Sequence, residues 1–281
     1  QPPLYREFRT FDGQLALGVQ AQKSLHIVAG SEFLFQMWGR QTPFKLNTEL
    51  YYKYLWDLNP YEIENVRTRY YANNNAVGYA YGLDINVHGE FVEGIQSFFK
   101  LGLLSTKEDI IGDTYTKYFN AAGERIIFGY SEDQTVVDSA VILPGFIPRP
   151  TDQWITFGAL VQDQMPGYEA FKVQMGLQYG ARLPYGPPDF TRYKDTLRMR
   201  SYFRVDLGLS YDLLHGKTEF RQGKKGWSAL DQALISLEIF NILGVNNVLS
   251  KQWIQDVQGK FYSVPNYLTQ RLFNLKFSIA F

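Results

Sequence analysis

Several long segments of the chain carry apolar side chains at every second position. Between Phe171 and Arg182 the odd-numbered residues are apolar, and the even-numbered residues are polar, charged or glycine. The segments Phe203–Leu213 and Val77–Phe91 show nearly the same alternation. Because successive side chains of a β-strand point to opposite faces, each segment is predicted to be a strand with one apolar and one polar face.

The length of these segments distinguishes two kinds of β protein. In a soluble sandwich, strands average about five or six residues and turns recur about every 8–12 residues. A strand tilted by about 45° needs about 9–11 residues to cross a bilayer, and a membrane barrel turns its apolar face outward. The alternation here has the longer span, and its second face suits a wet interior. We therefore expect an all-β fold, a transmembrane antiparallel β-barrel, rather than a soluble sandwich.

Six further segments alternate less regularly. The segment 231–243 also fits a helical spacing through Leu230, Leu234 and Leu237, so its period leaves strand and helix open. The last segment carries apolar residues at alternate positions up to the terminal Phe281, which would face lipid. In total nine strands are predicted, at about 22–37, 44–56, 77–91, 95–107, 152–163, 171–182, 203–213, 231–243 and 271–281.

The connections between these segments alternate in length. Residues 38–43, 93–94 and 164–169 form short connections, whereas 215–230 is long although it belongs to the same side. The long connections of the other side are 57–75, 108–151, 183–198 and 244–270. Because outer-membrane barrels have short periplasmic turns and long external loops, the C-terminus is predicted to lie at the periplasm.

An odd number of strands raises a structural problem. Single-chain bacterial barrels have an even number, and each unpaired backbone group at an edge within the hydrocarbon costs several kcal/mol. Either a further strand lies within residues 1–21, or the chain is a piece of a larger barrel. We favour the second interpretation.

Composition excludes several classes of protein. The 281 residues include 28 basic and 28 acidic side chains, and this balance offers no electrostatic footprint for nucleic acid. The absence of cysteine excludes disulfides, thiol catalysis and zinc-thiolate sites. No uncharged apolar stretch approaches 18 residues, which excludes membrane-spanning helices. Because the sequence starts at Gln1 without signal-peptide features, we expect a processed or excised chain.

An ordered series of sequence stretches runs along the whole chain. It begins with PLYREFRTFDG, AQKSLHIVAG and ELYYKYLWDLNPYEIENVRTRYYANNNAVGYAYGLD. It continues with IPRPTDQ, LPYGPPDFTRYKDTLRM and YFRVDLGLSYDLL, and it ends with SLEIFNILGVNNVLSKQWIQD, PNYLTQRLFNLKFSIAF and the terminal Phe. This series resembles the C-terminal part of the barrel of TonB-dependent outer-membrane receptors of the Bacteroidota type.

The resemblance implies a 22-stranded barrel whose lumen is closed by an N-terminal plug domain. Residues 1–281 would then supply about nine of those strands, and no stretch matches the plug or the segment that engages TonB. The implied partners are outer-membrane lipid, the remaining barrel strands, the plug domain and, through the plug segment, the TonB energising system. A surface lipoprotein is a further possible partner, because glycan-importing members pair with one. The implied location is the Gram-negative cell outer membrane, as a multi-pass β-barrel.

The chain shows no catalytic motif. Its histidines, at positions 26, 88 and 215, lie far apart without metal-binding spacing, and no nucleophile elbow, P-loop or dinucleotide fingerprint is present. Two carboxylate pairs, Glu108/Asp109 and Glu132/Asp133, fall in a predicted external loop. A solvated loop is the default interpretation for them, and calcium binding is the alternative. We expect no enzyme, no cofactor and no metal site.

Polar side chains on the inward face would meet water, the plug or cargo. The candidates for lining the lumen are Lys172, Gln174, Gln178, Arg182, Arg204, Asp206, Asp212 and Glu238. Hydrogen bonding to the plug or to one another is the alternative role for these side chains. Aromatic residues near the predicted strand ends fit interfacial belts between lipid and water, namely Trp38, Phe44, Trp56 and Phe91.

Two external loops combine cationic, aromatic and amide groups that suit polar ligands. The ligand-binding candidates are Arg67, Arg69, Tyr70, Tyr71 and Asn74 in the first loop, and Tyr185, Asp189 and Arg192 around a GPPD turn in the second. The leading functional hypothesis is active uptake of a nutrient such as a siderophore, a glycan or a peptide. A structural scaffold in an envelope complex and a passive porin are the alternatives.

Overall fold

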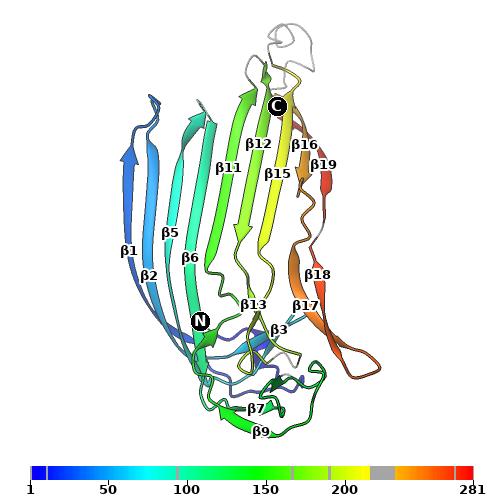
Figure 1. The fold of residues 1–281 in the computed structure, drawn as a ribbon. Coiled ribbons are helices and arrows are strands. Elements are labelled where there is room, and N and C mark those ends of the chain that lie inside the picture. Colours follow the sequence, from blue (N-terminus) through cyan, green and yellow to red (C-terminus); the bar gives the residue numbers. More distant parts are fainter. Residues whose placement is uncertain are drawn as a thin grey trace.

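Nine long strands follow one another in a single antiparallel meander (Figure 1). The computed structural model describes residues 2–10, 12–92, 95–165, 168–188, 191–215, 232–268 and 270–280. The strands are β1 (Lys23–Phe35), β2 (Phe44–Leu58), β5 (Ala76–Val92), β6 (Ile95–Ile110), β11 (Ile155–Met165), β12 (Tyr168–Gly180), β15 (Tyr202–Asp212), β16 (Gln232–Phe240) and β19 (Leu272–Ala280). All nine predicted strands are confirmed, and the ambiguous segment 231–243 contains a strand, β16. The terminal Phe281 lies outside the described residues.

The pairing register confirms the two faces that the alternation predicts. Between β12 and β15, Met175 pairs with Leu207, whereas the next pair is Gln174 with Gly208. The same separation continues across β16, where Leu237 lies opposite Leu209. We call the side that carries Met175 and Leu207 the apolar face, and the opposite side the polar face.

The meander is open at both ends (Figure 1). Among the described residues, β1 pairs only with β2 and β19 pairs only with β16. Both outer strands are exposed along most of their length, and Leu275 in β19 has an exposed fraction of 71%. The sheet therefore does not close into a barrel, and the number of strands in a complete barrel stays a prediction.

Small accessory sheets lie at one end of the long strands (Figure 1). Their strands are β3 (Tyr61–Glu64) with β4 (Arg67–Tyr70), β7 (Tyr115–Phe119) with β8 (Arg125–Ile126) and β9 (Asp138–Ile142), β13 (Pro184–Tyr185) with β14 (Leu197–Arg198), and β17 (Val248–Gln255) with β18 (Phe261–Tyr267). A short strand, β10 (Ile147–Pro148), pairs with β6. All of them fall within the predicted long connections, and we call this end the loop end. Apart from His215, the connection 215–230 lies outside the described residues.

The buried apolar core lies at the loop end rather than between the long strands. Leu58, Ala76, Ile110 and Ile147 form a buried cluster against which Tyr193 packs. Along the strands, most apolar side chains are partly or fully exposed, because the sheet is a single layer. The only helical element in the described residues is the short 3₁₀ turn η1 (Tyr5–Phe8), and no described helix could span a membrane.

Aromatic clusters lie near both ends of β2 and β5 on the apolar face. Phe44 is fully buried, with ring centroids 5.0 Å from Phe91 and 5.8 Å from Trp38. Near the loop end, the ring of Tyr54 stacks on Trp56 at 5.8 Å. The ten residue steps from Phe44 to Tyr54 span about 25 Å at a tilt of about 40°, which is the height of the apolar band of a membrane barrel. The positions of these aromatic residues therefore suit two interfacial belts.

Candidate functional site

A buried ion-pair network joins three parts of the loop end. Arg192, between β13 and β14, has an exposed fraction of 1%, and its Nε donates to Glu62 Oε2 of β3 at 3.0 Å. The Nη2 of Arg192 donates to Glu108 Oε1 of β6. Arg149 Nε donates to the other oxygen of Glu108 at 3.0 Å, and Tyr71 OH donates to Glu62 Oε1 at 2.9 Å. We call these five side chains the loop network.

Burial dominates the electrostatics of the loop network. It raises the pKa of Glu62 to about 7, although the charge of Arg192 opposes the shift. Burial, followed by the carboxylate of Glu62, raises the pKa of Tyr71. For Arg192, burial alone would lower the pKa, but the carboxylates of Glu62 and Glu108 outweigh it and raise it. Removing one member of the network would leave a buried charge without its partner.

The structure corrects the predicted environment of Glu108. This residue was expected in an exposed external loop, but β6 continues to Ile110 and buries the Glu108 side chain completely. Arg149 and Arg192 neutralise the carboxylate through two ion pairs. The second predicted pair, Glu132 and Asp133, is exposed as expected. Among the described residues, no three His, Asp or Glu side chains are grouped to hold a metal ion.

Ligand-binding candidates of the first loop are mostly engaged with the protein. The side chain of Asn74 donates to the carbonyl of Asp57 at 2.7 Å and to that of Gln20 at 3.0 Å. Arg69 forms an ion pair with Glu64. The remaining candidates here are Tyr70, whose ring lies 5.5 Å from that of Tyr61, Tyr71 in the loop network, and the exposed Arg67. Their contact with cargo stays a prediction.

Of the candidates in the second loop, Arg192 contacts the first loop through Glu62. The ring of Tyr185 stacks on Trp253 of β17 at a centroid distance of 6.2 Å. Arg192 donates to the carboxylates of Glu62 and Glu108 and to backbone carbonyls, so it holds loops together. Asp189 lies outside the described residues. The sequence offered no signal for the pairing of Arg192, because Glu62 is 130 residues away in the chain.

Four of the predicted lumen residues line one hollow on the polar face. This hollow has a volume of about 270 Å³, and its polar side chains include Gln174, Gln178, Asp206 and Glu238. Its floor contains Gly158, Gly176 and Gly208, where a side chain would meet open space or only ordinary contacts. These residues of three strands thus share the polar face, and their role in lining a lumen stays a prediction.

The other predicted lumen residues have different surroundings. Arg204 Nε donates to Asp206 Oδ1 at 2.7 Å, and its guanidinium lies 5.2 Å from the ring of Phe240. Lys172 is exposed on β12, and Asp212 accepts a hydrogen bond from the backbone of Leu214 at the end of β15. Arg182 lies beyond the end of β12 at Gly180, so it belongs to the loop rather than to the strand wall.

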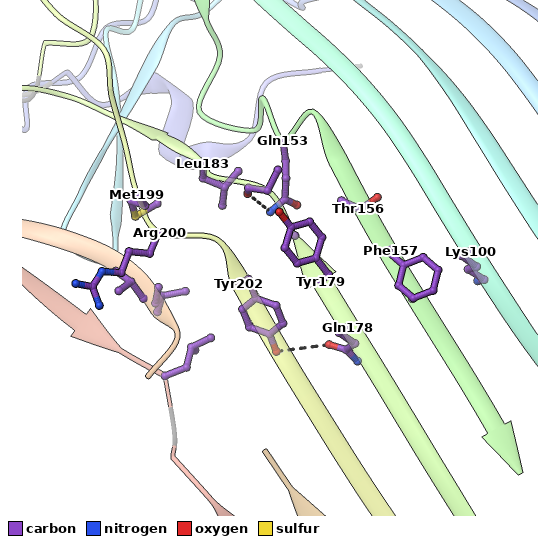
Figure 2. Close-up of a pocket in the computed structure, with 16 residues that line it drawn as sticks. Lys100, Gln153, Thr156, Phe157, Gln178, Tyr179, Leu183, Met199, Arg200 and Tyr202 are labelled. Atoms are coloured by element: carbon purple, nitrogen blue, oxygen red, sulfur yellow. Dashed lines mark hydrogen bonds between the residues drawn. The ribbon is translucent and has the colours of Figure 1, made fainter. Parts of the chain in front are cut away.

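A second hollow of about 470 Å³ lies where β11, β12 and β15 meet the loop end (Figure 2). Tyr202 OH donates to Gln178 Oε1 at 3.5 Å, so Gln178 takes part in both hollows. Lys100, Arg200 and Tyr202 line this hollow, and the sequence analysis did not single them out. The signal was available for Lys100, because it continues the inward alternation of its strand opposite Asn86.

Comparison with known proteins identifies a similar fold but no similar sequence. No protein-family profile matches the chain, and no curated protein sequence matches it. Over 98% of its length, the chain is similar to the crystal structure of Fiu, the ferric-catecholate import receptor of E. coli K12, in its closed form, with a TM-score of 0.52. The chain has a TonB-dependent receptor-like fold.

This receptor-like fold confirms the coarse level of the resemblance. The identity to Fiu is 13%, so the likeness concerns the fold alone. The chain spans 29% of the length of Fiu. The narrower assignment to Bacteroidota-type receptors stays a prediction.

Proposed function

We propose that this chain is the C-terminal part of the barrel of a TonB-dependent receptor that actively imports a nutrient across the outer membrane. The observation that carries the proposal is the division of the sheet. One face is apolar along strands of membrane-spanning length, and the opposite face is polar and hollowed. A passage for polar cargo along a barrel wall needs this division.

The open edges support a role within a larger assembly. The backbone of β1 and β19 has hydrogen-bonding groups that no described strand takes up, and such groups are costly in hydrocarbon. Further barrel strands would satisfy them, and a plug domain would cover the polar face. The TonB system would act through that plug, because the described residues provide a wall and loops rather than a gate.

Fiu is a ferric-catecholate import receptor, and its likeness to this chain makes a siderophore one candidate cargo. Glycans and peptides are the other candidate classes. The polar face carries cationic, anionic and amide groups, so it suits a hydrophilic cargo of any of these classes.

An uptake experiment tests this proposal. Cells that lack the receptor should lose growth on one scarce nutrient, and a protonophore should stop uptake of that nutrient by wild-type cells. Uptake that continues in the presence of the protonophore would contradict the proposal and indicate a passive pore. Unchanged uptake in the deletion strain, together with stoichiometric subunits that fill the lumen, would contradict it in favour of a scaffold.

A further inference from the structure

An exposed apolar segment lies at the outermost part of the loop end, on and around β9 (Figure 1). The side chains of Val137, Val141 and Leu143 have exposed fractions of 64%, 72% and 78%. In the proposed membrane setting, lipid would cover the apolar face of the long strands, but β9 lies beyond the ends of those strands. The exposure of this segment therefore needs an explanation other than contact with lipid.

One side of β9 is an open edge. The strand pairs with β7, and no other described strand pairs with it. Val141 lies opposite Thr116, and Ser139 lies opposite Tyr118, so Val141 and Ser139 share one face of this small sheet. An unpaired edge presents backbone N–H and C=O groups to a further strand. The β9 edge is therefore open to a strand from another chain.

The sequence around β9 lacks the features that protect other edge strands. Such edges are commonly protected by lysine, by proline or by a β-bulge. Residues 132–143 contain no lysine, arginine, proline or glycine, and β9 pairs with β7 without a shift in register. The β-branched residues that favour strands are Thr135, Val136, Val137, Val141 and Ile142. The segment thus has the composition of a strand that pairs.

The acidic side chains of this segment limit what can pair with it. Glu132, Asp133 and Asp138 are exposed, and residues 126–148 contain no basic side chain. Like charges on adjacent strands are destabilising, whereas opposite charges stabilise the pair. A second copy of the chain would bring two acidic segments together. The charge therefore favours a basic partner strand over self-association.

The cations of the same small sheet leave this acidic character in place. Lys117 of β7 lies 5.7 Å from the centre of the Tyr115 ring, and Arg125 of β8 forms an ion pair with Asp195. The Asp138 carboxylate accepts the backbone N–H of Ser139 at 2.7 Å, which keeps the carboxylate beside the open edge.

We propose that the β9 edge docks an extended segment of another protein, which adds as a further strand and carries basic residues around an alternating apolar core. Backbone hydrogen bonds would hold the added strand, and its alternate apolar side chains would pack beside Val141. Its basic residues would pair with the acidic side chains of residues 132–138. The inference goes beyond the proposed function, because it assigns a protein partner and does not depend on the cargo.

Fluorescence anisotropy with the intact, purified receptor that contains this chain tests the inference. The probe is a labelled peptide with the core Thr-Val-Thr-Val-Thr and two lysines at each end. One comparison peptide has glutamates in place of the lysines, and another is N-methylated throughout its core. We expect both to bind at least about tenfold more weakly, because one is repelled and the other lacks backbone donors.

Two outcomes of the peptide experiment would overturn the inference. Equal binding of either comparison peptide would show that charge or backbone pairing does not matter. No binding of the lysine peptide would show that other parts of the receptor cover the β9 edge or that the edge does not pair.

Matched variants locate the binding. Val141→Lys places a cation at the edge and should weaken binding of the lysine peptide at least about tenfold. Val257→Lys is the control, because Val257 lies between β17 and β18 and is fully exposed, and it should bind as wild type does. Equal affinity of the two variants would overturn the inference. Unchanged protease resistance of the loops shows that the fold is intact.

Oligomeric state distinguishes a protein partner from a second copy. Analytical ultracentrifugation should show no self-association through the β9 edge. A dimer that Val141→Lys dissociates would show that a second copy occupies the edge, and it would overturn the inference. Because none of these measurements involves uptake, their failure would leave the proposed function standing.

Discussion

The environment of a side chain is determined differently in the sheet of nine long strands, which we call the strand wall, and at the loop end. In the wall, each side chain is assigned to a face by its position within its own strand, as the pairs Met175–Leu207 and Gln174–Gly208 show. At the loop end, the environment of a residue depends on partners far away in the chain. Glu108 and Arg192, for example, are 84 residues apart and form a buried ion pair.

The difference concerns where each region obtains its stability. The wall is a single layer ordered by backbone pairing, and in the proposed membrane setting lipid would cover its apolar face. The loop end carries the packed apolar cluster and the buried charges, so it resembles the core of a soluble protein. Substitutions in the two regions should therefore destabilise the protein through different interactions.

Arg192→Ala should have the largest effect and should act on the loops alone. It leaves the carboxylates of Glu62 and Glu108 buried with fewer partners, which we expect to cost about 3–5 kcal/mol. Rapid cleavage of the loops by added protease, with the long strands still protected, is the expected result. Arg67→Ala, at an exposed position, is the control and should change protease resistance little. Unchanged loops in Arg192→Ala would contradict the structural role of the network.

Leu207→Arg should disrupt the wall and leave the loop network unaffected. An arginine on the lipid side near the middle of the bilayer costs about 2–4 kcal/mol. Gly208→Arg is the matched control, because Gly208 lies on the polar face and its nearest neighbour to an added Cβ is 3.5 Å away. Assembly into the outer membrane, followed by heat-modifiable mobility in gels, measures the difference. Equal assembly of the two variants would contradict the assignment of the faces.

Gly89→Ala should have a smaller effect, confined to the cluster of Phe44, Phe91 and Trp38 at the end of the strands opposite the loop end. The added Cβ would lie 2.2 Å from a ring carbon of Phe44, so the ring has to move, at a cost of about 1–3 kcal/mol. Gly158→Ala, also within a long strand, has nothing within 4 Å of its added Cβ and should be neutral. Unfolding in urea from lipid vesicles gives both free energies. A neutral Gly89→Ala would show that the ring has room to move.

The smallest expected effect is a pH dependence of the loop end. Burial raises the pKa of Glu62 from 4.5 to about 7. Between these two pH values the folded loops therefore keep a proton on Glu62 that the unfolded chain releases. Their stability should therefore decrease as the pH rises from about 4.5 to about 7 and then level off. Glu62→Gln cannot ionise, and its protease resistance should lack this component. Parallel pH profiles of wild type and Glu62→Gln would contradict the shift.

Sequence alone predicted the wall well because the period of a strand is a local property. All nine long strands were confirmed, and the face of Gln174, Gln178, Asp206 and Glu238 followed from their positions within those strands. For the segment 231–243 the spacing left strand and helix open, and the structure shows the strand β16 there. Strand ends were less accurate, which is why Arg182 was placed in the wall and Glu108 in a loop.

The loop end was predictable only in outline. The lengths of the connections indicated which end would carry it, but pattern reading cannot indicate that Arg192 meets Glu62, or that Trp253 meets Gly186. These contacts depend on how separate loops fold over one another. Arg192 and Tyr71 were singled out for their chemistry, and the structure shows that Arg192 contacts Glu62 of another loop, whereas Tyr71 contacts the same Glu62 within its own loop.

Accessibility along β15 tests most directly whether the two faces see lipid and water. Because the chain contains no cysteine, single cysteines introduced at positions 203–211 can each carry one spin label. In the receptor reconstituted in lipid, labels at odd positions should be most accessible to oxygen. Labels at even positions should be accessible to a water-soluble nickel complex, or immobilised where they contact a plug. Two-residue alternation with opposite phases is the predicted result. Accessibility without that alternation, or odd positions shielded from lipid, would contradict the membrane-wall account.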